Sequence, residues 1–231
     1  MSVTLPVAGS SAYCELRPSK IIALGLNYLD HIEETRSEVP KEPILFAKTP
    51  NVLIGPGESI IIPSFLYESG FDDVVVHYEA ELAFVMAERA SRVGEEAAMD
   101  LVLGFTCFND VSQRNLQFGD ASGWFRGKSL DTFGPVGPVI VPAGELGRDP
   151  HDLRIACRLN GETVQESSTS KMLFGIPRMI SFISRQITLE PGDIVATGTP
   201  SGVGRIRNGD TVEIEIEGIG VLTNTVVEEH R

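Results

Sequence analysis

In the stretch VVVHYEAELAFVM, residues 74–86, polar and apolar side chains alternate over residues 77–82, and a continuous apolar run follows. A run of this kind predicts a β-strand, in which successive side chains point to opposite faces. His77, Glu79 and Glu81 are then expected on one face. The residues expected on the other face are Val76, Tyr78, Ala80 and Leu82. The strand therefore lines up three polar side chains on one wall.

Two neighbouring carboxylates on a half-buried strand repel each other and lose hydration, and a bound divalent cation removes both costs. Oxygen ligands favour a hard ion such as Mg²⁺, Mn²⁺ or Ca²⁺. The alternative is the solvent face of an edge strand, where alternating charge is ordinary. The pattern alone gives these two interpretations comparable weight.

Further candidate groups lie in two later segments. GFTCFND (104–110) places Asp110 at the end of an apolar run, although Asn-Asp is also typical of a turn or a helix cap. In WFRGKSLDTFGPVGP (124–138), Lys128 precedes a segment rich in Pro and Gly, which favours a lysine held by its surroundings. The alternative for Lys128 is an ordinary surface lysine.

His31 and Glu34 are three residues apart, which on a helical turn brings them within reach of each other. A carboxylate beside an imidazole orients the ring as a general base acting on water. This spacing is also common by chance.

The sequence motifs of cysteine, serine and nucleotide chemistry are missing. Cys107 has no histidine near it in the sequence, GxSxG is absent, and GTPSGVG (198–204) lacks the lysine of a P-loop.

Most apolar runs after residue 59 are short and rich in Val and Ile, and PGD and NGD turns punctuate the last third. We expect helices in three places, at 94–104, around 111–118, and at 172–187 with Pro177 near a first turn. The proline-rich segment 37–58 is expected to be a loop. Residues 1–17 are expected to be a lead-in strand at an edge and residues 18–231 one catalytic domain. The fold class is α+β, dominated by β-structure.

The composition and charge of the chain limit the partners and the compartment that we expect for it. The chain has 231 residues, of which 42% are hydrophobic, and its net charge is −13. This charge disfavours nucleic acid and anionic membranes as partners, while a bound cation still allows an anionic small substrate. No apolar stretch is long enough to span a membrane. Three widely spaced cysteines without a paired motif favour a reducing compartment, and we expect a cytoplasmic protein.

Seven segments, taken together and in this order, resemble the fumarylacetoacetate hydrolase (FAH) superfamily in its short single-domain form. The resemblance covers roughly residues 18–227. The segments are GLNYLDHIEE (25–34), PILFAKTPNVLIGPG (43–57), YEAELAFVM (78–86), GFTCFNDVSQRNLQ (104–117), RGKSLDTFGPVGP (126–138), LNGETVQ (159–165) and LEPGDIVATGTPSGVG (189–204). The resemblance implies a roll of mixed β-sheets with a few short helices, and a homodimer.

The resemblance also implies roles for individual residues. The metal ligands for Mg²⁺ or Mn²⁺ fall on Glu79, Glu81 and Asp110. A His/Glu dyad carried over the substrate by a mobile segment falls on His31 and Glu34. Lys128 would stand beside the developing enolate as a catalytic group, and the substrate contacts fall on Lys48, Arg114, Gln117 and Thr199.

Three positions depart from the pattern that the resemblance implies. His77 stands where an acidic residue is expected, and we interpret it as a partner of a metal ligand. Leu26 stands where some acylpyruvate-cleaving members have Arg, and Asn115 replaces a common Asp. The last two changes leave the expected metal ligands intact but bear on the substrate.

The function implied is a divalent-metal-dependent enzyme acting on 2-oxo or 1,3-dicarbonyl carboxylic acids through a metal-bound enolate. Acylpyruvate hydrolysis of the fumarylpyruvate type and oxaloacetate decarboxylation lead, because both His31 and Glu34 are present to activate water. The alternative is an isomerase or tautomerase acting on 2-hydroxyhepta-2,4-diene-1,7-dioate or oxaloacetate. A different class is a non-catalytic, metal-stabilised protein.

Overall fold

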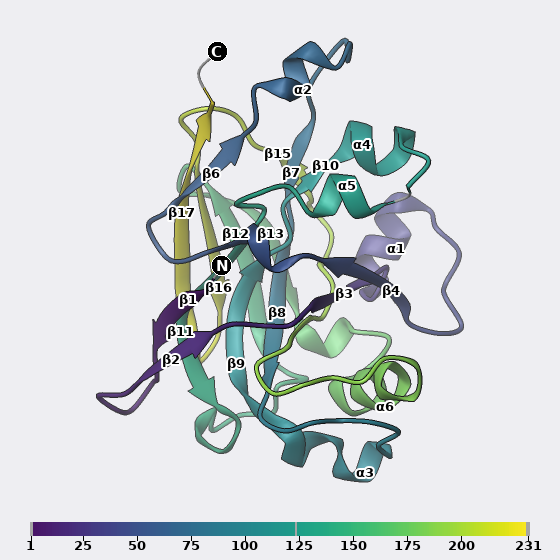
Figure 1. Cartoon of the computed structure of the whole chain (residues 1–231), viewed down its shortest axis with the longest axis vertical. Coiled ribbons are helices and arrows are strands. Elements are labelled where there is room, and N and C mark those ends of the chain that lie inside the picture. Colours follow the sequence, from purple (N-terminus) through teal and green to yellow (C-terminus); the bar gives the residue numbers. More distant parts are fainter. Residues whose placement is uncertain (1, 123, 230–231) are drawn as a thin grey trace.

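The computed structural model describes residues 2–122 and 124–229, and its main feature is a pair of mixed β-sheets packed against each other (Figure 1). The larger sheet has the strand order β4-β3-β14-β8-β9-β11-β5. Its strands are β3 (Ile21–Gly25), β4 (Ile44–Lys48), β5 (Leu53–Ile54), β8 (Ala80–Met86), β9 (Val102–Asn109), β11 (Gly134–Pro142) and β14 (Ile194–Ala196). The smaller sheet, ordered β13-β12-β16-β17-β6, comprises β6 (Ser59–Ile62), β12 (Arg154–Leu159), β13 (Glu162–Ser168), β16 (Thr211–Ile216) and β17 (Gly220–Glu228).

Short elements surround the sheets. Two further strand groups are the hairpin of β1 (Val3–Pro6) and β2 (Tyr13–Leu16), and the group β10 (Ser112–Gln113), β7 (Val76–Tyr78) and β15 (Gly204–Arg205). The helices are α1 (Leu29–Thr35), α2 (Phe65–Glu68), α3 (Glu95–Ala98), α4 (Arg114–Gly119), α5 (Trp124–Lys128) and α6 (Ile176–Gln186). Single 3₁₀ turns lie at Pro50–Val52, Met99–Leu101, Ala143–Glu145 and Thr169–Lys171. The prediction of a β-dominated mixed roll with few short helices is confirmed.

Strand β8 lies in the middle of the larger sheet and is buried on both faces. Leu82 and Phe84 belong to the main core, which lies between the two sheets and also takes in α6. Ala83 and Val85 belong to a second core on the opposite face, which the β1–β2 hairpin covers. A strand packed on both faces reads as a continuous apolar run, which explains the second half of the 74–86 stretch.

The acidic half of that stretch is a strand interrupted at Glu79, between β7 and β8. The predicted apolar set of Val76, Tyr78, Ala80 and Leu82 lies together in the main core, so the predicted division of faces is confirmed. The alternative of a solvent-facing edge strand is wrong, because Glu79 is only 6% exposed and Glu81 only 1%.

One loop prediction and one strand prediction in the first 58 residues need correction. Residues 37–58 are not all loop: they form β4 at the edge of the larger sheet and β5 at its other edge. Edge positions tolerate nearby prolines because one side of the strand needs no ladder partner, and Pro43 and Pro50 flank β4. The N-terminal lead-in is a two-stranded hairpin, and its Leu5 is fully buried. How the chain divides into a lead-in and a catalytic domain stays a prediction.

The helix predictions have mixed outcomes. Helix α6 begins at Ile176 with Pro177 in its first turn, as predicted. The segment 94–104 is helical only to residue 101, because Val102 starts β9 and pairs with Met86 of β8. Residues 111–118 split into the short strand β10 and helix α4. Among the helices described, none has the length and apolarity needed to cross a membrane.

Candidate functional site

A cavity of about 570 Å³, lined by Glu79 and Glu81 among others, opens beside α1, α4 and α5, and three buried acidic side chains meet next to it. They are Glu79, Glu81 and Asp110, all buried, and one carboxylate oxygen from each lies within 4.8 Å of the others. Oxygens on opposite sides of one divalent ion lie roughly 4–5 Å apart. Glu79 and Glu81 are two residues apart in the sequence, and the fold brings the distant Asp110 to them.

The backbone at the strand break positions this cluster. Asn109 Oδ1 accepts a hydrogen bond from the Glu79 N–H at 3.0 Å, and the Asp110 N–H donates to the Glu79 carbonyl at 2.9 Å. Both contacts join the end of β9 to the interruption between β7 and β8. Asp110 is thereby fixed beside Glu79, and the buried Asn109 is a positioning residue that the sequence pattern did not single out.

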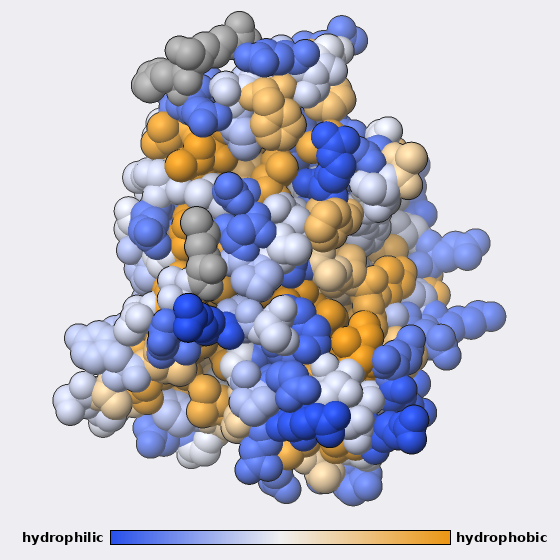
Figure 2. Space-filling view, viewed as in Figure 1, coloured by the Kyte–Doolittle hydropathy of each residue, from blue (hydrophilic) through white to orange (hydrophobic). Residues whose placement is uncertain are grey.

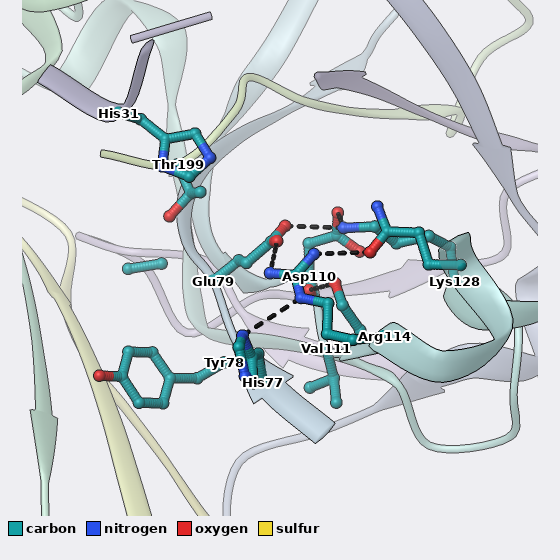
Figure 3. Close-up of polar contacts among 12 residues, drawn as sticks. His31, His77, Tyr78, Glu79, Asp110, Val111, Arg114, Lys128 and Thr199 are labelled. Carbon is teal, nitrogen blue, oxygen red and sulfur yellow. Dashed lines mark hydrogen bonds and ion pairs between the residues drawn. The ribbon is translucent and has the colours of Figure 1, made fainter. Parts of the chain in front are cut away.

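Three cations contact the acids (Figure 3). Lys128 Nζ donates to Glu79 Oε2 at 2.7 Å and to Asp110 Oδ2 at 2.6 Å. Lys48 Nζ donates to Asp110 Oδ1 at 2.6 Å, and Arg114 Nη2 donates to Glu79 Oε1. Two of the three acids, Glu79 and Asp110, are therefore paired with cations inside the protein.

The pKa directions follow from these neighbours. Burial alone would raise the pKa of Glu79, but Lys128 and Arg114 outweigh burial and hold it far below its usual range. Burial likewise opposes the charge of Lys128, yet Asp110 and Glu79 outweigh it and raise the pKa of this ammonium. Glu79 and Lys128 are therefore both charged near neutral pH.

Glu81 differs from the other two acids. It accepts a hydrogen bond from the Gly198 N–H at 2.9 Å, and within the described residues it has no ion-pair partner. Burial, followed by the charges of Asp110 and Glu79, raises the pKa of Glu81 well above its usual value. An uncompensated buried carboxylate beside two others is what a divalent cation neutralises, so the donor set fits Mg²⁺ or Mn²⁺.

Lys128 is held in place by the packing of α5 against α4. A Cβ on Gly127 would lie 2.7 Å from both the Gln113 carbonyl oxygen and the Gln117 nitrogen, so only glycine allows this approach. Gln113 in turn caps α4 by accepting a hydrogen bond from the Leu116 N–H. The Arg-Gly-Lys order in the sequence thus fixes a buried lysine, and the surface-lysine alternative is wrong, since Lys128 is 1% exposed.

His31 and Glu34 lie on α1 and line the same cavity as Glu79 and Glu81. His31 Nδ1 is 3.3 Å from Glu34 Oε2, and Glu34 also accepts hydrogen bonds from the Gly202 N–H at 3.1 and 3.2 Å. In the close-up, His31 and Thr199 lie on one side of Glu79, and Lys128 and Arg114 on the other (Figure 3). The predicted dyad is therefore assembled in the structure.

The expected substrate contacts divide into two groups. Arg114, Gln117 and Thr199 line the cavity, with Arg114 Nη1 donating to Gln117 Oε1 at 2.6 Å. Lys48 does not line the cavity: its side chain is fully buried, and it also donates to the Val111 carbonyl at 3.2 Å. The structure therefore places Lys48 against Asp110, and its role as a substrate contact stays a prediction.

The residues noted as departures lie next to the site. His77 lines the cavity and its Nδ1 accepts a hydrogen bond from Arg114 Nε at 3.2 Å. Burial, then the charge of Arg114, lowers the pKa of His77 to about 4, so the ring is a neutral acceptor. Asn115 does not contact the acids; its Oδ1 accepts from the Val75 N–H and its Nδ2 donates to the Asp73 carbonyl.

The sequence pattern also missed Gln165, in the LNGETVQ segment. Its side chain is 1% exposed, its Oε1 accepts from the Ala80 N–H at 3.0 Å, and its Nε2 donates to Thr199 Oγ1 at 3.0 Å. Gln165 thereby joins the strand that carries the acids to the loop that carries Thr199. A polar residue in a β-run was a weak signal, because alternation alone predicts that it faces solvent.

Comparisons with known proteins show the family to which the chain is related. A family model described as fumarylacetoacetate (FAA) hydrolase C-terminal matches residues 20–227. The mitochondrial oxaloacetate tautomerase Fahd2a of Rattus norvegicus is 43% identical over 91% of this chain and 67% of its own length.

Two solved structures of named enzymes are also similar to this chain in fold and sequence. A 5-carboxymethyl-2-hydroxymuconate delta-isomerase from Mycobacterium smegmatis has a TM-score of 0.81 and 42% identity, with 93% of this chain and 80% of that chain covered. A fumarylpyruvate hydrolase from Pseudomonas aeruginosa, in complex with Mn²⁺ and pyruvate, has a TM-score of 0.87 and 29% identity, with 99% and 97% covered.

Proposed function

The chain belongs to the fumarylacetoacetate hydrolase family of enzymes, and from that membership we propose that it hydrolyses acylpyruvates with the help of a divalent metal ion. Water attacks C4 of the 2,4-dioxo acid and the C3–C4 bond breaks. C4 leaves as a carboxylic acid, while C3 takes a proton and leaves as the methyl group of pyruvate. The observation that carries this proposal is the His31/Glu34 pair lining the same cavity as the acid cluster.

We assign Glu79, Glu81 and Asp110 to hold Mg²⁺ or Mn²⁺, supported by the spacing of their oxygens and by the Mn²⁺ in the Pseudomonas aeruginosa hydrolase. The ion, when bound, supplies Lewis acidity that polarises the oxygens of the substrate. Lys48 does not line the cavity, and its Nζ donates to Asp110 Oδ1 and holds that carboxylate in its orientation.

Lys128 supplies fixed positive charge at the floor of the cavity. As the C3–C4 bond breaks, negative charge develops on the pyruvate portion, and a preorganised ammonium stabilises it without reorganising. The three internal cations pair with Glu79 and Asp110 and leave Glu81 without an ion-pair partner among the described residues, so a bound divalent ion would neutralise Glu81 and leave positive charge for an anionic substrate. The pyruvate carboxylate satisfies that charge.

His31 is assigned as the general base. With Nδ1–H donating to Glu34, the lone pair of Nε2 is free to take a proton from water, and the same ring returns a proton to C3. Glu34 holds the ring in this tautomer and is itself held by the Gly202 N–H. Thr199, which lies near His31 in the close-up, and Arg114, which lies on the other side of Glu79, are assigned as substrate contacts (Figure 3). Gln117, which accepts a hydrogen bond from Arg114 and lines the cavity, is assigned with them.

A second candidate is enol–keto tautomerisation of a 2-oxo acid, favoured by the 43% identity to an oxaloacetate tautomerase. It moves a proton between C3 and the enol oxygen and needs no attacking water. Oxaloacetate decarboxylation, the third reaction, loses CO₂ instead of adding water. The non-catalytic alternative has no support, because the relatives found are hydrolases, isomerases and tautomerases.

The test is a substrate panel of acetylpyruvate and oxaloacetate with the purified protein and MgCl₂. Enol absorbance and pyruvate are followed together. Hydrolysis produces pyruvate and acetate from acetylpyruvate, whereas tautomerisation changes the enol absorbance of oxaloacetate without producing pyruvate. The hydrolase proposal fails if acetylpyruvate is stable while the enol of oxaloacetate is consumed.

The variant His31→Ala separates the dyad from the metal site. We expect it to lower kcat for acetylpyruvate by ~10²–10⁴-fold, the usual contribution of a general base, and to leave Mg²⁺ affinity unchanged by calorimetry. Glu33→Gln is the matched control, because Glu33 lies on the exposed side of α1 and does not line the cavity. Full activity of His31→Ala would remove the dyad from the mechanism.

Two further properties stay proposals. We propose that the protein is a homodimer, which light scattering of the purified chain measures. A cytoplasmic location is the other, and fractionation of the source cells tests it.

A further inference from the structure

The cavity has charged groups at its floor and several apolar side chains along its walls, while the exposed Glu34 and Thr35 add polar groups near its mouth. The acids and Lys128 are buried, whereas Phe118, which also lines the cavity, is 73% exposed and therefore lies at the rim. The apolar lining residues are Leu24, Leu26, Phe46, Val75, Phe118, Trp124 and Val203. Orange, apolar side chains are also visible on this face of the molecule, where Figure 1 draws β4, α4 and α5 (Figure 2).

An aromatic wall connects the floor to the mouth. Lys128 Nζ lies 4.9 Å from the centre of the Phe46 ring, and the Trp124 ring packs edge-on against Phe46 at 5.2 Å between centroids and 68° between planes. Gly25 makes room for this arrangement, since a Cβ there would lie 2.8 Å from Trp124 Cζ3. The indole is therefore seated against backbone rather than lying loosely on the surface.

Leu26 adds a second indication. Its φ is 53°, in the left-handed region that a leucine adopts only at a cost. The strain occurs at the junction of β3 and α1, just before the helix that carries His31. The side chain so held lines the cavity. A strained apolar residue in a cavity wall points to a role in the cavity rather than in the core.

The positive side chains of the cavity already form ion pairs and hydrogen bonds with other groups of the protein. Among the described lining residues, the permanent cations are Lys128 and Arg114. Lys128 contacts Glu79 and Asp110, and all three nitrogens of the Arg114 guanidinium donate, to His77, Gln117 and Glu79. A second carboxylate, at the far end of a substrate, would meet apolar side chains instead of a cation, and an unpaired charge in such surroundings is costly.

We propose that the outer half of the cavity is a subsite for an uncharged, apolar acyl group, so that the substrates are acylpyruvates with a hydrocarbon or aryl end rather than dicarboxylates. This inference rests on the proposed function. Trp124, Phe46 and Leu26 are its specificity-determining residues. The volume of about 570 Å³ lies within the range of pockets that enclose ligands much larger than pyruvate.

The test compares three acylpyruvates with the same reacting atoms and different ends: acetylpyruvate, benzoylpyruvate and fumarylpyruvate. We expect kcat/KM of the wild-type protein with Mg²⁺ to be at least ~10-fold higher for benzoylpyruvate than for fumarylpyruvate, the scale of discrimination that an apolar pocket achieves. Equal values, or a preference for fumarylpyruvate, would overturn the inference.

Variants of Leu26 and Trp124 test whether these side chains cause the preference for an apolar acyl group. Leu26→Arg is expected to raise kcat/KM for fumarylpyruvate by ~10-fold and to lower it for benzoylpyruvate, and Trp124→Ala to lower the ratio of benzoylpyruvate to acetylpyruvate. Phe125→Ala is the control, because Phe125 is next to Trp124 and 49% exposed but does not line the cavity. An unchanged ratio in a folded Trp124→Ala protein would refute the assignment.

Binding of unreactive probes separates this inference from the proposed function. Phenylpyruvate and 2-oxoglutarate are both 2-oxo acids without a 4-oxo group, so neither can undergo the hydrolysis. Calorimetry with Mg²⁺ should show phenylpyruvate binding at least ~10-fold more tightly. If no acylpyruvate is cleaved but this preference is found, the hydrolase proposal fails and the subsite stands; if cleavage occurs and 2-oxoglutarate binds more tightly, the subsite fails alone.

Discussion

Replacing Lys48 by methionine tests whether the acid cluster depends on its buried cations. Lys48 and Asp110 have side chains that are 0% exposed, and Lys48 Nζ is 2.6 Å from Asp110 Oδ1. Burial lowers the pKa of Lys48, and the charge of Asp110 offsets part of that effect. Methionine keeps the length of the apolar chain and removes the charge.

Removing one partner of a buried ion pair costs ~3–5 kcal/mol, because the other charge is left in a medium that solvates it poorly. Asp110 retains Lys128 at 2.6 Å, so the lower end, ~3 kcal/mol, is expected for Lys48→Met. For a chain of this size each kcal/mol shifts Tm by about 2–4 °C, which gives a fall of about 6–12 °C.

The assay is urea unfolding in EDTA, followed by circular dichroism and by the fluorescence of Trp124, the single tryptophan of the chain. Lys20→Met is the matched control. Lys20 pairs with the buried Asp193 but is itself 24% exposed, so solvent screens the pair and the expected cost is ~1 kcal/mol or less.

A double-mutant cycle completes the test. Since Lys48→Met/Asp110→Asn removes both charges of one pair, the double variant should be more stable than the sum of the single losses predicts, by ~1–3 kcal/mol. Equal losses in Lys48→Met and Lys20→Met, or strict additivity in the cycle, would refute the view that Lys48 compensates the charge of Asp110.

Three further outcomes are expected. Glu81→Gln lowers Mg²⁺ affinity, measured by calorimetry, by at least ~100-fold and activity with it, because Glu81 is the acid of the cluster without an ion-pair partner among the described residues. Gln165→Ala lowers the free energy of unfolding in urea by ~1–3 kcal/mol and lowers kcat/KM, because it removes the hydrogen bonds that join Thr199 to Ala80 of strand β8. Asp193 is buried, which raises its pKa, but hydrogen bonds led by Lys20 outweigh burial and leave the pKa lowered. Its stabilisation, ~1–3 kcal/mol, is therefore present above about pH 4 and disappears as pH falls through the lowered folded pKa, so wild type and Asp193→Asn should converge in unfolding free energy at low pH.

The sequence by itself determined the class of fold and the chemical types at the site. The 74–86 stretch predicted which residues share each face, because side-chain direction along a strand depends only on local geometry. The order of seven short segments predicted the family, and the three-residue spacing predicted that His31 and Glu34 are in contact. Helix α6 followed from local signals too, since Pro177 sits in its first turn.

The tertiary structure decided what depends on distant parts of the chain. Edge strand β4 and the start of β9 at Val102 form by pairing with other strands of the sheet, and a local sequence pattern does not contain these partners. Burial is likewise a property of the whole fold: it places the Lys48 ammonium against Asp110 inside the protein, and it makes Gln165 a link between two segments. Charge compensation and cavity walls depend on distances in space, so only the folded chain reveals that the cations at the floor are already paired and that apolar rings line a wall of the cavity.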